Sequence, residues 1–110
     1  MRRRGARARA GRVAEGADVE RLRKNYRTAF LRYLPRREET TLALAYDIGR
    51  AAVADRTSVL LIAHLHHDVL REVLADSPPD DADQVIARGG EFFAEVLASV
   101  EMTQRSLRHG

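Results

Sequence analysis

The stretch TSVLLIAHLHHDVLREVL, residues 57–74, decides the fold. At about 100° per residue its apolar side chains fall on one wide arc of a helix, with the charged side chains opposite. The arc holds Val59, Ile62, Ala63, Leu65, Val69, Leu70, Val73 and Leu74. The stretch therefore predicts an amphipathic helix of roughly five turns, capped by Thr57 or Ser58. His66 lies in the middle of the arc, so we expect a neutral core histidine that is hydrogen-bonded across the protein.

Three other stretches repeat apolar residues at intervals of three and four. Asp18 is placed to cap a first helix over residues 18–34, which ends before Pro35. We expect a second helix over residues 38–54 and a fourth from about residue 79 to residue 108. Four amphipathic helices with short connections and no alternating segment predict an all-α, antiparallel four-helix bundle.

The second and fourth helices each carry a line of small side chains in addition to an apolar face. The second helix should bury Leu42, Leu44, Ala45, Ile48, Gly49, Ala52 and Val53. Its outer ridge holds Glu39, Ala43, Asp47, Arg50 and Ala54. The fourth helix should bury Val85, Ile86, Phe92, Phe93, Val96, Leu97, Val100 and Leu107. A second stripe holds Ala87, Ala94, Ala98 and Met102. Both lines are flat enough for another helix or sheet to approach, although alanine is also a common surface residue in helices.

Glycines interrupt the fourth helix at Gly89–Gly90. Each costs near 1 kcal/mol relative to alanine in a helix interior. We therefore expect a kink or a close helix approach at this point.

Composition favours a single domain with a basic tail. A chain of 110 residues with 45% hydrophobic content can build one core. Six of the 19 basic residues lie in the first twelve positions: Arg2, Arg3, Arg4, Arg7, Arg9 and Arg12. The rest then has 13 basic against 16 acidic residues. Residues 1–17 have almost nothing apolar to bury, so we expect a disordered arm before a folded domain over residues 18–110. The lack of cysteine and of any long apolar run predicts a cytoplasmic protein.

No pattern in the chain predicts an enzyme. There is no glycine-rich phosphate loop, no serine or cysteine elbow, and no carboxylate pair on an apolar floor. His64, His67 and Asp68 are spaced to face one helix surface and could contact a metal, with His109 as the remaining histidine. The same histidines also fit the phospho-accepting helix of two-component kinases. A solvated polar edge is the simpler reading, so we expect no catalytic residue, cofactor or metal.

Four short patterns of residues carry a family resemblance. They are Tyr26–X6–Tyr33–Leu34, Glu39–X2–Leu42–X2–Ala45–X4–Arg50, His66–X2–Val69–Leu70–X2–Val73–Leu74 and Phe92–Phe93–X–Glu95–Val96–Leu97–X4–Met102. In this order and at these intervals they resemble the N-terminal domain of the RsbU family of stress-response phosphatases. The resemblance covers about Asn25 to Leu107, which is nearly all of the expected folded part.

The resemblance implies a helical domain that dimerises and docks a switch protein, the RsbT-type kinase. In the family, docking activates an attached serine/threonine phosphatase domain that dephosphorylates an anti-anti-sigma factor and so releases a stress sigma factor. The partner surface there uses positions that match Glu39, Ala43, Ala94 and Ala98. Glu39 keeps the acidic type of the family, whereas alanine replaces a bulky side chain at the other three.

We therefore interpret the chain as a non-catalytic regulatory domain that forms a homodimer and binds a protein partner. The expected partner surface is Glu39, Ala43, Asp47, Ala94 and Ala98. Leu31, on the outer side of the first helix, is a candidate dimer contact. Two alternatives stay open. One is a nucleic-acid-associated protein that uses the arginine arm with Arg21, Arg23, Lys24 and Arg27. The other is a phospho-accepting or metal-binding bundle.

Overall fold

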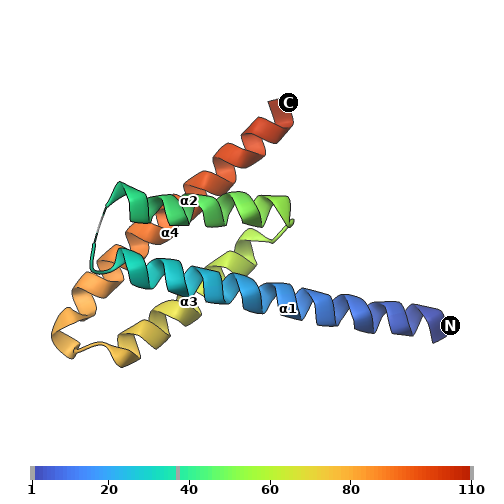
Figure 1. The fold of residues 1–110 in the computed structure, drawn as a ribbon, viewed down its shortest axis with the longest axis horizontal. Helices are drawn as coiled ribbons and strands as arrows, with labels where there is room; N and C mark the ends of the chain where they lie inside the picture. The colour runs from blue at the N-terminus through green and yellow to red at the C-terminus, as the bar shows by residue number, and fades with distance from the viewer. Residues whose placement is uncertain (1, 37, 110) are drawn as a thin grey trace.

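The computed structural model describes the backbone of residues 2–36 and 38–109, and the side chains of residues 16, 18–36 and 38–108. Over these ranges the protein has no strand and four α-helices: α1 (Arg2–Tyr33), α2 (Glu39–Ala54), α3 (Val59–Asp76) and α4 (Ala82–His109). The prediction of an all-α four-helix bundle is confirmed. Helices α1 and α2 form one antiparallel hairpin, α3 and α4 form a second, and the two hairpins cross (Figure 1).

Two helix starts differ from the predicted ones. Helix α1 begins at Arg2 and not at Asp18, since no proline interrupts this arginine- and alanine-rich segment and extending a formed helix is cheap. The predicted disorder of residues 1–17 stays a prediction, because Gly16 is the only one of them whose exposure is described. The fourth helix begins at Ala82, after a 3₁₀ turn over Pro79–Asp81. Proline cannot donate to an α-helical ladder, and the Asp81 N–H bonds the Pro78 carbonyl at 3.0 Å instead.

The ends of α2 and α3 follow local capping chemistry. Ser58 caps α3, as predicted, by accepting a hydrogen bond from the Leu61 N–H at 3.1 Å. At the end of α2, the N–H groups of Arg56 and Thr57 bond the carbonyls of Val53 and Ala52 at 3.1 and 2.8 Å. This is a Schellman motif, and it places Arg56 at φ 57°, in the left-handed region where glycine is usual. The tight turn brings α3 back across α1.

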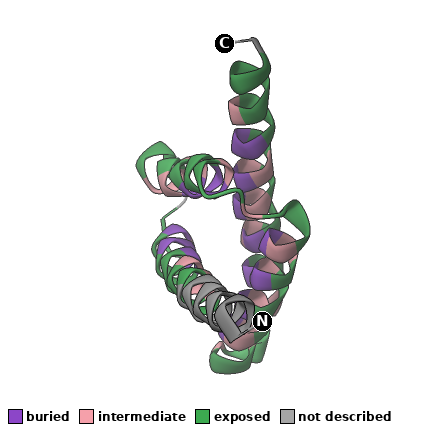
Figure 2. Ribbon diagram, turned by 90° about the vertical axis from the view of Figure 1, so that its right-hand side faces the viewer, coloured by how far each residue is buried: buried purple, intermediate pink, exposed green. Residues whose placement is uncertain are grey.

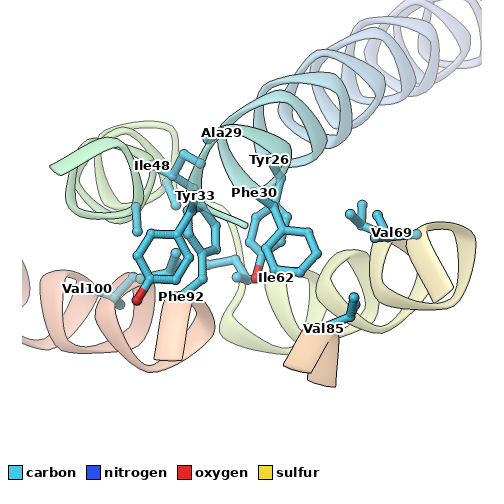
Figure 3. Close-up of a cluster of buried hydrophobic side chains, with 14 residues drawn as sticks. Tyr26, Ala29, Phe30, Tyr33, Ile48, Ile62, Val69, Val85, Phe92 and Val100 are labelled. Atoms are coloured by element: carbon cyan, nitrogen blue, oxygen red, sulfur yellow. The ribbon is translucent and has the colours of Figure 1, made fainter. Parts of the chain in front are cut away.

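Aromatic rings form the centre of the core (Figure 3). Phe92 of α4 is fully buried and meets three rings of α1. The centroid distances are 5.1 Å to Tyr26, 5.7 Å to Phe30 and 5.8 Å to Tyr33. The first two contacts are edge-on, which is a favoured geometry for aromatic pairs. These rings join α1 to α4, while Ile62 and Val69 bring α3 into the same cluster.

Most of the predicted core residues are buried or half-buried, but three are exposed. Val59, Ile86 and Leu107 are 47%, 50% and 68% exposed. Val59 is the first residue of α3. Ile86 lies at the edge of the apolar arc of α4. Leu107 belongs to the last turns of α4, which project beyond the crossing with α2 and are mostly exposed (Figures 1 and 2). A helical wheel cannot show where the covering helices end.

Candidate functional site

His66 forms a cross-helix hydrogen bond, as predicted. Its Nδ1 lies 2.6 Å from the hydroxyl oxygen of Tyr26 on α1, and its ring stacks on Phe93 of α4 with centroids 4.4 Å apart. Burial lowers the pKa of His66, and the neighbouring His67 lowers it further. Burial also raises the pKa of the Tyr26 phenol. The hydrogen bond therefore joins a neutral imidazole of α3 to a neutral phenol of α1, and the stacking on Phe93 adds α4 to the contact.

The other histidines of α3 do not assemble a metal site in the described part of the chain. His64, His67 and Asp68 are exposed, and no three side chains of metal-binding type come together among the described residues. His109 is a position whose side chain lies outside the described ranges. The geometry gives His66 a structural position and leaves the exposed imidazoles on the solvent side of α3.

The closest helix approach lies where α2 crosses α4. A Cβ atom on Gly49 would lie 2.6 Å from both the Cβ of Ser99 and the carbonyl oxygen of Val96, so only glycine fits. The fully buried Ser99 hydroxyl donates to the Tyr46 carbonyl at 2.5 Å. The helical periodicity places Gly49 on the buried arc of α2, but it does not predict the burial of Ser99, because serine is more often a surface residue. Gly89 and Gly90 of α4 differ from each other in their surroundings. Gly89 is buried near Leu70 and Phe30, and Gly90 is exposed with open space around it.

The five predicted partner residues are all exposed on this helix pair. Glu39, Ala43 and Asp47 lie on the outer ridge of α2, and Ala94 and Ala98 lie on the outer stripe of α4. A shallow groove of about 340 Å³ lies between the two helices, where Arg50 from the ridge and Met102 from the stripe line it, and none of the five predicted residues does. We call the ridge, the stripe and this groove the α2–α4 face. The five predicted residues on this face are exposed, so substitutions there can be made with little change to the core.

Polar side chains add to the contacts that the aromatic rings of helix α1 make with the other helices. Glu72 of α3 forms ion pairs with Arg23 and with Arg27, the latter at 3.4 Å. The Tyr33 hydroxyl donates to Glu91 of α4 at 2.7 Å. These contacts occupy the surface of α1 that faces α3 and α4, in contrast to the open α2–α4 face.

The fold and this surface define a class, a small helical domain that presents an exposed face of two crossed helices. Among the described residues, no helix is long and apolar enough to cross a membrane. The chain matches the family described as phosphoserine phosphatase RsbU, N-terminal domain, over residues 24–103. It therefore belongs to the RsbU N-terminal domain family, as the four residue patterns predicted. No curated protein and no solved structure matches the chain in the same comparisons.

Family membership assigns the chain a regulatory part in RsbU stress signalling. The match is to the N-terminal domain, and no phosphatase domain is evident in the 110 residues. The family also implies a protein partner in the Rsb pathway.

Proposed function

We propose that this domain docks an RsbT-type switch kinase on the α2–α4 face, in the cytoplasm, and thereby controls an output phosphatase in a sigma-factor stress response. The domain contributes binding and no chemistry of its own. Family membership supports a partner of the Rsb pathway. The exposure of Glu39, Ala43, Asp47, Ala94 and Ala98 on two helices in contact supports the choice of surface.

The exposure of these small side chains on two helices that pack against each other is the observation that carries this proposal. The exposed small side chains let the backbone of a partner helix approach closely. The crossing beneath them is held by Gly49 and Ser99, so the two helices present a fixed shape. Since alanine here stands where the family has bulky side chains, the matching kinase should supply the larger side chains of the contact.

Steric block of the face tests the proposal. Ala94→Arg and Ala98→Arg place long side chains where a close-packed partner must lie, and we expect each to weaken kinase binding by tenfold or more. Ala75→Arg, an exposed alanine on α3, is the matched control and should bind like the parent. Titration calorimetry with the purified kinase gives the affinities. Normal binding by both α4 variants would place the docking surface elsewhere.

We also propose that the domain forms a homodimer, as its family resemblance implies. Leu31 is 41% exposed on the outer side of α1 and is our candidate contact. Light scattering should give twice the mass of one chain at high micromolar concentration, and Leu31→Glu should shift the species toward half that mass. A monomer for the parent at this concentration would contradict the proposal.

A further inference from the structure

Helix α1 carries most of the positive charge of the protein. Its 32 residues include eleven basic and three acidic ones, whereas the rest of the chain has eight basic and 13 acidic residues. Six of the eleven basic residues are the arginines within residues 2–12. The proposed docking face lies on α2 and α4, so it makes no use of this charge.

The described side chains of α1 continue this charge along the outer side of the helix. Arg21, Lys24 and Arg32 are exposed, and at about 100° per residue they fall within one quarter of the helix circumference. Lys24 and Arg32 form no ion pair among the described residues. Arg21 lies 3.8 Å from the exposed Asp18, which makes a weak pair. The two arginines that pair with Glu72 face α3 instead, so the outer side of α1 keeps its positive charge.

Helix α1 continues toward the N-terminus beyond the other three helices (Figure 1). We call this part, residues 2–17, the extension; at 1.5 Å per residue it is about 24 Å long. At 100° per residue the positions of Arg2, Arg3 and Arg4 are distributed around the whole helix axis, so no single face of the extension holds the arginines. A helix with charge on every side matches a groove with two negative walls better than it matches a flat surface.

The major groove of duplex DNA has this shape. It is about 12 Å wide in the B form and admits an α-helix between two phosphate backbones. All six basic residues of the extension are arginine, whose guanidinium group can form two hydrogen bonds with one phosphate. The phosphates would repel the acidic remainder of the chain, so α1 is the helix that should face the DNA.

Composition argues against two other anionic partners. A helix that binds a membrane surface needs an apolar face, and Val13 is the only sizeable apolar residue in the extension. A site for single-stranded nucleic acid commonly uses aromatic side chains on which bases stack, and the extension has none. Duplex DNA therefore fits this helix best.

We propose that α1 binds the phosphate backbones of duplex DNA through the extension and through Arg21, Lys24 and Arg32. Phosphate contacts carry no sequence information, so the binding is independent of base sequence. It releases counterions, so the affinity falls steeply as salt rises. This site and the proposed docking face lie on different helices, so binding at one does not require the other.

Fluorescence anisotropy of the full chain with short labelled DNA duplexes tests the proposal. We expect a micromolar dissociation constant at about 50 mM salt that rises about a hundredfold at about 200 mM, as for about four phosphate contacts. Two duplexes of different base sequence should bind equally well. Replacing the six arginines of the extension by glutamine should abolish most of the binding and of its salt dependence.

Single substitutions give a matched pair that leaves the extension intact. Arg21→Gln should reduce the slope of log affinity against log salt by about one, because one phosphate contact is lost. Arg105→Gln removes the same charge from an exposed position of α4 and should leave the slope unchanged. Circular dichroism of each variant checks that the helices remain folded.

Three results would overturn the proposal. The first is no binding of the duplex at low salt, and the second is binding that persists in the six-glutamine variant. The third is tighter binding to vesicles of phosphatidylserine and phosphatidylcholine than to the duplex, which would assign the charge of α1 to a membrane surface. None of these results bears on kinase docking, which the Ala94→Arg variant tests separately.

Discussion

Helix α1 and the α2–α4 crossing are held by different kinds of contact. Helix α1 packs three aromatic rings on Phe92 and adds polar contacts at side-chain tips. The polar contacts are the Tyr26–His66 hydrogen bond, the Tyr33–Glu91 hydrogen bond and the two ion pairs of Glu72. At the crossing, α2 meets α4 at Gly49, and the Ser99 hydroxyl bonds a main-chain carbonyl. One contact relies on large side chains with polar tips, and the other relies on the absence of a side chain at Gly49.

The difference separates the residues that hold α2 against α4 from the residues that we propose bind the partner. A contact made by main chain and very small residues uses only the inner line of α2 and α4. The outer line, with Ala43 and Ala94, is exposed and forms the proposed partner surface. Helix α1, in contrast, uses the side chains of Arg23, Tyr26, Arg27 and Tyr33 to contact α3 and α4.

The largest effect on the free energy of unfolding should come from adding one carbon atom at Gly49, where α2 crosses α4. Gly49→Ala should lower the free energy of unfolding by about 3 kcal/mol, at the top of the range for overpacking, because the new Cβ meets a main-chain oxygen that cannot rotate away. Gly90→Ala is the matched control. Its Cβ has nothing within 4 Å, so it should raise stability by about 1 kcal/mol through helix propensity. Urea titrations of both variants give the comparison, and equal signs for the two would contradict our description of the crossing.

Removing the imidazole should have the next largest effect. His66→Ala should cost about 2 kcal/mol, since it leaves a cavity beside Phe93 and removes the partner of the Tyr26 hydroxyl. Kinase affinity should change only as far as folding does. Tyr26→Phe, which removes the hydroxyl alone, should cost less than His66→Ala. If His66→Ala folds like the parent but abolishes signalling, then His66 has a chemical role and the structural assignment is wrong.

A smaller effect should appear as a pH dependence of stability. The pKa of His66 is lower in the folded state than its ordinary value of about 6.5, so the unfolded chain binds the proton more readily. The stability associated with neutral His66 is therefore complete above about pH 6.5 and is lost as the pH falls through the folded pKa. Unfolding free energies of the parent and of His66→Phe between pH 8 and pH 5 give the test. Parallel curves for the two proteins would contradict it.

The smallest effect should follow deletion of residues 1–17. Their composition offers almost no apolar surface to bury, and the described polar contacts of α1 begin at Asp18. We expect the melting temperature to stay within a few degrees of the parent by calorimetry. A larger loss, which corresponds to more than roughly 1 kcal/mol for a domain of this size, would show that the arm packs against the bundle.

The sequence predicted those features that depend on periodicity. The helices, the core position of His66 and the exposed lines on α2 and α4 all follow from the spacing of apolar residues at three and four. The four family patterns predicted a protein partner of the Rsb pathway. Exposure of Glu39 or Ala94 could be predicted because a helix fixes which residues share a face.

The features that sequence did not predict depend on how helices meet. The role of Ser99 requires the Tyr46 carbonyl, which comes from a residue 53 positions away. The ion pairs of Glu72 likewise require the crossing of α1 and α3. The exposure of Leu107 depends on where α2 ends beside α4. Periodicity describes one helix at a time, so it cannot predict contacts between helices.

We propose that the partner binds the α2–α4 face and not α1. The most direct test is a nuclear magnetic resonance titration of the isotope-labelled domain with the unlabelled RsbT-type kinase. We predict that the amide signals of Ala43, Ala94 and Ala98 shift or broaden most, while those around Glu72 on α3 change little. If the largest changes lie on α1 and α3 and the three alanine signals do not move, the proposed docking surface is wrong.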